Sequence, residues 1–320
     1  MQRPWTVGVN LCVGAVLVAA LLIGEAWAAE VWVTNMKSAN VQVFDPATLK
    51  VVATIPADKG AHNVTFSPDE KLAFIANVGA NNVTIIDAVR REALGNVEAG
   101  TRAHQVAVSP DGKLALVSNP GSDNITLIDV PQRKAIHTMP TGKGAMMAVF
   151  SGDGTRAFVA NAGDANVSVV DVKAHKELSK FSAGKGVMAF EPTKDWKLAW
   201  LTGPDEDRVL IVDLAKGEPV AAIDVPGEPH GLALSPDGKL AFVVQRKLNQ
   251  LAMIDTASRQ ITNTAPAGKR PDMIAVSPDG ETLYVTSRDE NKLLAVSADD
   301  LKVTAEADTG DEPHGVAYRK

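Results

Sequence analysis

Hydrophobic and polar residues alternate along most of the chain in short runs separated by turn residues. In one unit, residues 63–66 alternate, Ser-Pro-Asp-Glu follows at 67–70, and an apolar run covers 72–76. Alternation returns over 83–87, and a weaker run follows at 93–97. Strict alternation predicts half-buried strands, and Pro and Asp between two such runs predict hairpin turns. The unit therefore predicts four short antiparallel strands.

The unit repeats with a period of 42 residues, without insertion or deletion. An Asp ends the third predicted strand in six units, a position that suits an Asx turn, and Ser297 takes this place in the last unit. These residues are Asp45, Asp87, Asp129, Asp171, Asp213 and Asp255. Four antiparallel strands in a repeat of about 40–45 residues are typical of a β-propeller blade. We therefore expect an all-β propeller.

The two ends of the repeat array predict the number of blades. Residues 31–35 match the second strand of a unit, and residues 314–318 match a first strand. Six complete units and one blade shared between the ends give seven blades. In the shared blade the C-terminal strand pairs with the N-terminal strands and leaves no free edge.

The first 28 residues predict a secretory signal rather than part of the fold. Arg3 is followed by an apolar run over 7–23 and by Ala26-Trp27-Ala28, a cleavage-site pattern. We expect the propeller domain to cover 29–320, in the periplasm or secreted, with no membrane span after cleavage; a retained N-terminal anchor is the alternative. Cys12, the one cysteine, lies inside this segment, so disulfides and thiolate metal sites are excluded from the propeller.

Val-Thr-Asn at 33–35, the Ser-Pro-Asp-Gly turns and the Ile-Asp strand ends resemble the YVTN-repeat propellers. The resemblance covers the chain after the signal. That superfamily includes surface-layer-like repeats, YncE-like periplasmic proteins and the haem d1 domain of cytochrome cd1. The resemblance implies the fold, and it does not choose among these functions.

The first strand of each blade lines the central channel of a propeller, so its first residue is a candidate site position. At this position the seven units carry His62, His104, Met146, Met188, His230, Asp272 and His314. Ring closure makes His314, His62 and His104 neighbours. Imidazole binds copper, zinc, nickel or iron, and thioether adds a preference for copper. The copper-cluster domain of nitrous oxide reductase is similar in being a histidine-lined, seven-bladed propeller. The alternative is that a duplicated histidine only hydrogen-bonds the neighbouring blade.

Basic residues recur on the loops that precede the first strands. They are Lys59, Arg102, Lys143, Lys185, Lys269 and Arg270. A basic rim attracts an anionic ligand such as a carboxylated cofactor, a haem propionate or an acidic peptide. The alternative is that these lysines and arginines only keep exposed loops soluble, and the opposing loops carry acidic residues.

Composition narrows the function without naming it. The chain has 32 basic and 38 acidic residues, a net charge of −6, which argues against a nucleic-acid partner. The sequence favours an exported binding protein for a metal ion, copper foremost, or a small anionic ligand. The alternatives are a non-catalytic scaffold that docks another exported protein, a binder of a d1-type haem, and a lactonase or lyase. The regular repeat, without inserted loops, argues against an elaborate enzyme pocket.

Overall fold

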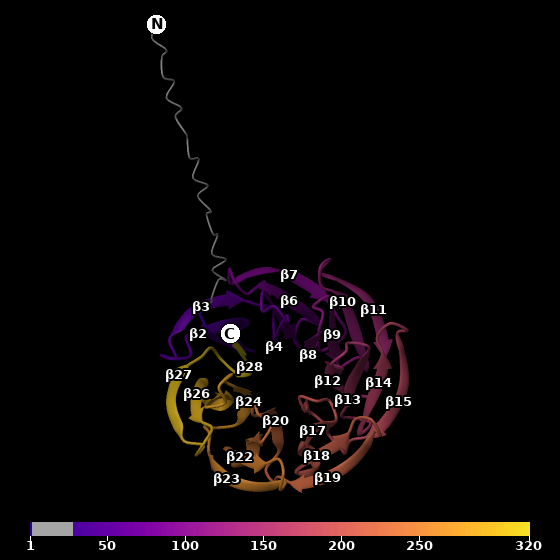
Figure 1. Ribbon diagram of the computed structural model, residues 1–320, viewed down its shortest axis with the longest axis vertical. Helices are drawn as coiled ribbons and strands as arrows, with labels where there is room; N and C mark the ends of the chain where they lie inside the picture. The colour runs from indigo at the N-terminus through magenta and orange to yellow at the C-terminus, as the bar shows by residue number, and fades with distance from the viewer. Residues whose placement is uncertain (2–27) are drawn as a thin grey trace.

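The computed structural model describes Met1 and residues 28–320. The predicted secretory signal therefore lies almost wholly outside the described residues. Within them, no helix is long and apolar enough to cross a membrane. Seven four-stranded antiparallel sheets form a closed ring (Figure 1), which confirms the predicted propeller and its blade count.

Each blade uses the four strands of the repeat in order, from the channel to the perimeter (Figure 1). The first strands are β4 (Ala61–Phe66), β8 (Gln105–Val108), β12 (Ala145–Phe150), β16 (Phe190–Pro192), β20 (Pro229–Leu234), β24 (Pro271–Val276) and β28 (Pro313–Arg319). The second strands are β1 (Glu30–Asn35), β5 (Leu72–Asn77), β9 (Leu114–Asn119), β13 (Arg156–Asn161), β17 (Leu198–Gly203), β21 (Leu240–Gln245) and β25 (Thr282–Ser287).

The third strands are β2 (Asn40–Phe44), β6 (Asn82–Asp87), β10 (Asn124–Asp129), β14 (Asn166–Asp171), β18 (Arg208–Asp213), β22 (Gln250–Asp255) and β26 (Lys292–Ser297). The fourth strands are β3 (Val51–Pro56), β7 (Glu92–Glu98), β11 (Lys134–Pro140), β15 (Lys176–Ser182), β19 (Glu218–Asp224), β23 (Gln260–Pro266) and β27 (Val303–Asp308). In three blades a short 3-10 helix joins the second and third strands: η1 (Pro204–Glu206), η2 (Arg246–Leu248) and η3 (Arg288–Glu290). The strand-ending Asp forms the expected Asx turn, because Asp45 Oδ1 accepts hydrogen bonds from two backbone amides.

The ring closes as the sequence predicts. Strand β28 pairs with β1, so the last blade has the order β28-β1-β2-β3. Three groups around the buried Glu30 carboxylate reinforce this seam: Arg319 from β28 at 3.0 Å, Arg91 from the neighbouring blade, and the Trp32 indole at 2.8 Å. The seam is therefore held by a ladder of backbone hydrogen bonds and by a buried ionic cluster.

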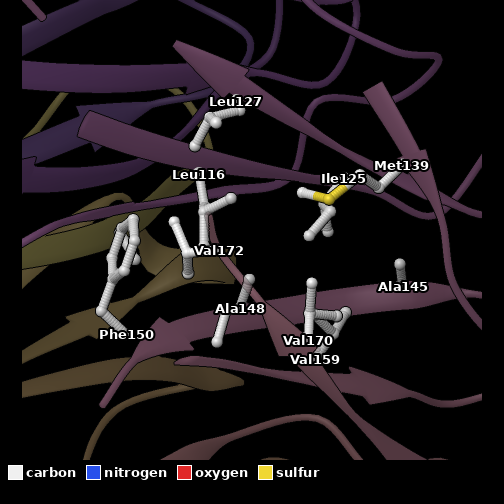
Figure 2. Packing of buried hydrophobic residues seen from close by; sticks show 12 residues of the cluster. Leu116, Ile125, Leu127, Met139, Ala145, Ala148, Phe150, Val159, Val170 and Val172 are labelled. Atoms are coloured by element: carbon white, nitrogen blue, oxygen red, sulfur yellow. The ribbon is translucent and has the colours of Figure 1, made fainter. Parts of the chain in front are cut away.

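The hydrophobic core lies between the blades rather than within them. Figure 2 shows one interface, in which Leu116 and Ile125 of one blade face Val159 and Val170 of the next. Comparable clusters occupy the other interfaces around the ring. Each fully buried Val, Leu or Ile contributes about 1.5–3 kcal/mol, so the stacked sheet faces hold the ring together and fix the channel at its centre.

Candidate functional site

Four histidines meet at one end of the channel, and we call them the histidine cluster: His62, His104, His230 and His314. All four are buried. The imidazole centres of His62 and His314 lie 3.6 Å apart, those of His62 and His104 4.1 Å, and those of His230 and His314 5.9 Å. The four histidines predicted from the repeat thus form one chain of neighbouring rings, in the order His104, His62, His314 and His230.

Irregular strand starts position these side chains. In the β4–β5 ladder Ala61 pairs with Asn77 and Asn63 with Ala76, so His62 is an extra, unpaired residue. The strands β12, β20, β24 and β28 shift register at the equivalent place. A bulge takes a residue out of the regular alternation and re-aims its side chain. In these five blades the repeat therefore places one re-aimed side chain at the channel mouth, whereas β8 and β16 begin only after His104 and Met188.

Backbone carbonyls of the neighbouring blade orient three of the imidazoles. His314 Nδ1 donates to the His62 carbonyl at 3.0 Å, His62 Nδ1 to the His104 carbonyl at 3.0 Å, and His104 Nδ1 to the Met146 carbonyl at 2.8 Å. A carbonyl only accepts, so Nδ1 carries the hydrogen and the lone pair lies on Nε2. The His230 Nδ1 has no hydrogen-bond partner among residues 28–320.

The cluster is uncharged at neutral pH. Burial lowers the pKa of His104 to about 3 and that of His314 to about 4. Burial lowers the pKa of His62 and of His230 well below the ordinary value, helped by the other histidines at His62 and by Arg246 at His230. Neutral imidazole is the form that binds a metal ion, so protons do not compete for the Nε2 lone pairs near pH 7.

Three of the seven residues at the predicted site position are spaced closely enough to bind one metal ion. The candidate ligand atoms of His230, Asp272 and His314 all lie within 4.8 Å of one another. The Nε2 of His314 is 3.7 Å from Asp272 Oδ2. The rings of the predicted arc, His314, His62 and His104, lie tilted against one another, with interplanar angles of 31° and 44°. In the part of the chain that the structure describes, no hydrogen bond engages the Nε2 of any of the four histidines.

Two arginines that sequence reasoning missed hold Asp272. Arg246 and Arg288 both contact its carboxylate, which is completely buried. Glu228 and Glu312 pair in turn with Arg246 and Arg288. These arginines compete with any metal ion for Asp272. The sequence could have indicated these two arginines, because they depart from the repeat. The equivalent positions in the other five blades are uncharged: Met36, Val78, Pro120, Ala162 and Pro204.

The two methionines of the predicted ring have different places. Met188 lines a cavity of about 600 Å³ at the channel mouth, together with His230 and Arg246. Met146 contributes its carbonyl, which accepts hydrogen bonds from His104 and from Ser118. The cavity gives a ligand access to one side of the histidine cluster.

The six basic residues of the predicted rim are exposed on their loops. Within residues 28–320 none of them forms an ion pair within 4 Å. The charges of Arg102 and Arg270 reach the cluster, because they contribute to the low pKa of His104 and of His230. Asp205 and Asp207 border the same mouth, so the rim is mixed in charge.

Comparisons with known proteins agree with this fold. A family model described as lactonase, 7-bladed beta-propeller, matches residues 88–302, more than half of the chain, and a model described as cytochrome D1 heme domain matches residues 27–146. The predicted relation to the haem d1 propeller is thereby confirmed. No curated protein sequence matches the chain.

Solved structures with this fold come from several proteins. The periplasmic gluconolactonase PpgL of Pseudomonas aeruginosa has a TM-score of 0.76 at 20% identity, over 91% of this chain and 99% of that one. The dihydro-heme d1 dehydrogenase NirN, in complex with DHE, has a TM-score of 0.68 at 16% identity, over 90% and 74%. The hydrazine synthase of Kuenenia stuttgartiensis has a TM-score of 0.71 at 21% identity, over 80% and 89%. At these identities the likeness shows the fold alone, whereas the family match shows that the chain belongs to the seven-bladed β-propeller lactonase family.

Proposed function

We propose that this chain is an exported binding protein that holds a copper ion at the histidine cluster. The observation that carries the proposal is a group of four buried, uncharged imidazoles in which no hydrogen bond engages Nε2 in the described chain. In the described chain the one buried nitrogen of the cluster without any hydrogen-bond partner is Nδ1 of His230. Buried polar groups without partners are costly, and a metal ion bound there offsets that cost.

The donor set favours copper among the transition metals. Imidazole nitrogens suit several of these metals, and a thioether shifts the preference toward copper, Cu(I) above all. Met188 shares the mouth cavity with His230 and is the thioether that would complete the site. The Nδ1 hydrogen bonds to backbone carbonyls are the outer contacts that commonly fix metal-binding histidines.

Metal content and affinity test this proposal. The exposed, stacked pair His137 and His175, 4.3 Å between ring centres, is first replaced by alanine, because two surface imidazoles also bind copper. In that background we expect about one equivalent of copper, and His314→Gln is expected to lower the affinity by about tenfold or more. The proposal is refuted if the His314→Gln variant binds copper as tightly as its parent, the protein without His137 and His175. It is also refuted if that parent binds no copper although its circular dichroism shows that it is folded.

Export is part of the same proposal. It is supported by the predicted secretory signal and by the structural likeness to a gluconolactonase described as periplasmic. A fusion of residues 1–28 to a reporter that works only outside the cytoplasm tests it. An inactive fusion, with the reporter made and retained in the cytoplasm, contradicts export.

Family membership favours a second function, lactone hydrolysis. His230 borders the mouth cavity and has no hydrogen-bond partner at Nδ1 among the described residues, so it is the candidate general base. The test is the hydrolysis of δ-gluconolactone by metal-free protein. This function requires a rate above the spontaneous one that returns to background in His230→Gln.

The rim supports a third ligand, a d1-type haem. Lys59, Arg102 and Lys143 are exposed and lie in the segment that matches the cytochrome D1 heme domain model. Their charges suit the carboxylates of such a cofactor. Protein from a host that makes this haem is expected to show a Soret-region band, and colourless protein from that host excludes it.

A further inference from the structure

A second cavity lies in the central channel, below the histidine cluster. Its volume is about 510 Å³, and all seven first strands contribute to its walls. It begins one residue further along these strands, at Asn63, Gln105, Met147 and Met273. At its far end Pro236, Pro278, Tyr318 and Lys320 line it, beside the turns to the second strands. This lower channel is distinct from the mouth cavity at Met188 and His230.

Glu191 is the one acidic side chain in the walls of the lower channel. The equivalent positions of the other six blades are uncharged: Thr65, Ala107, Val149, Ala233, Ala275 and Ala317. The carboxylate therefore did not arise from the repeat consensus. A single charged residue in an otherwise neutral ring of equivalent positions indicates a role in binding at that point of the channel.

Glu191 has no partner in the described chain. Neither a hydrogen bond nor an ion pair to its carboxylate is found there, and burial raises the pKa of the carboxyl to about 7. The Glu191 side chain is half-buried, and an unpaired carboxylate drawn partly out of water is unfavourable in its charged form. A cation brought beside it restores the lost stabilisation.

Other polar groups of the walls are already occupied. Gln105 donates to the Val106 carbonyl and accepts from the Ala148 amide, and Met147 Sδ accepts from the Phe190 amide. Asn63 forms no side-chain hydrogen bond within residues 28–320, and its strand β4 lies three blades from β16, across the channel. The polar groups left for a ligand along the walls are thus one carboxylate and one amide on opposite sides, and the Tyr318 hydroxyl and the Lys320 ammonium group lie at the far end.

The rest of the lower channel is largely apolar. Ala189, Leu232, Ile274 and Val316 line it between these two groups. Lys320, at the far end, is exposed to solvent. The walls therefore favour a ligand with an apolar body and a single charged group.

We infer that the lower channel binds a small organic ammonium ion, with Glu191 as its counter-ion. The ammonium group pairs with the Glu191 carboxylate, and the apolar body lies against the aliphatic walls. The Asn63 amide lies opposite and accepts or donates one further hydrogen bond. A ligand carboxylate is repelled by Glu191, and a neutral ligand leaves it unpaired. This site does not depend on metal at the histidine cluster.

Calorimetric titration of metal-free protein tests the inference, because an amine then has no copper to coordinate. The probes are propylammonium, hexylammonium and benzylammonium. Benzyl alcohol and benzoate are the controls, because they match benzylammonium in shape but are neutral and anionic, respectively. At about pH 8 we expect one equivalent of an ammonium probe to bind, and benzyl alcohol and benzoate to bind about tenfold more weakly or not at all.

Two variants assign the binding to Glu191. Glu191→Gln keeps the shape and removes the charge, and is expected to lower ammonium affinity by about tenfold or more. Glu98→Gln, on the exposed face of β7, is the control and should bind like the parent. The inference is overturned if no ammonium probe binds, if benzyl alcohol binds as well as benzylammonium, or if Glu191→Gln, folded by circular dichroism, retains full affinity.

Discussion

At the scale of single residues, each oriented histidine of the cluster is fixed by one hydrogen bond that also sets its tautomer. The chain of donors runs from His314 to His62 to His104 and ends on the Met146 carbonyl. Each imidazole thereby depends on the backbone of the next blade. This order leaves the lone pairs of these three imidazoles on Nε2.

Glu191 makes a residue-scale prediction about pH. Its pKa is about 7 in the folded protein and near 4.5 in the unfolded chain. Between these values the folded state holds the proton and the unfolded state does not, so stability falls as pH rises through this range. The loss is at most about 3 kcal/mol at pH 8. Glu191→Gln should therefore gain stability relative to the parent as pH rises.

Urea unfolding of both proteins at about pH 5 and pH 8 measures this gain. Only the difference between the two proteins is compared, because the other groups that titrate in this range are common to both. Tyr318 and Lys320, which line the same cavity, are present in both proteins. An equal difference at the two pH values means that Glu191 is not buried as an unpaired carboxyl.

At the scale of strands, hydroxyls of the second strands hold the carbonyls of the cluster. Thr34, Thr202 and Thr286 donate to the carbonyls of His62, His230 and His314 in the next blade, at 2.7–2.8 Å. The bulges free these carbonyls from the regular ladder, and the hydroxyls satisfy them. Each bulge is therefore stabilised across a blade interface rather than by its own sheet.

Thr202→Val tests this arrangement with almost no change in shape. The substitution removes the acceptor of the Ala189 amide and the donor to the His230 carbonyl, both buried. Leaving such groups unsatisfied costs about 1–3 kcal/mol. Val244 at the equivalent place in the next blade shows that valine fits. Thr54→Val, on the exposed face of β3, is the control and should change the free energy of unfolding by less than about 0.5 kcal/mol. Equal effects of both variants contradict this role.

At the scale of the whole molecule, closure joins the two ends of the described chain through Glu30. Its carboxylate is 4% exposed and faces Arg91 and Arg319. Breaking a buried ion pair by removing one partner typically costs about 3–5 kcal/mol. We expect Glu30→Ala to lower the free energy of unfolding by this amount, measured by urea unfolding. Glu92→Ala, exposed on β7, should have almost no effect; a comparable loss there would mean that the seam is not special.

The sequence predicts the ring well, because an unbroken 42-residue period carries strand order, blade count and closure. The same period identifies the four cluster histidines. It could not show that Arg246 and Arg288 reach Asp272, because these arginines lie on turns of two neighbouring blades and their contact with Asp272 depends on how those blades pack. Glu191 was missed for a related reason. A single departure from the repeat looks like ordinary variation until the channel encloses it.

The most direct test of the copper site is X-ray absorption at the copper edge, on protein that lacks His137 and His175. Copper held by the histidine cluster predicts several nitrogen neighbours with the outer-shell scattering of imidazole rings, and a sulfur neighbour if Met188 binds. His314→Gln should reduce the imidazole contribution. A spectrum of oxygen neighbours without imidazole scattering, unchanged in His314→Gln, would place the copper elsewhere and contradict the proposed site.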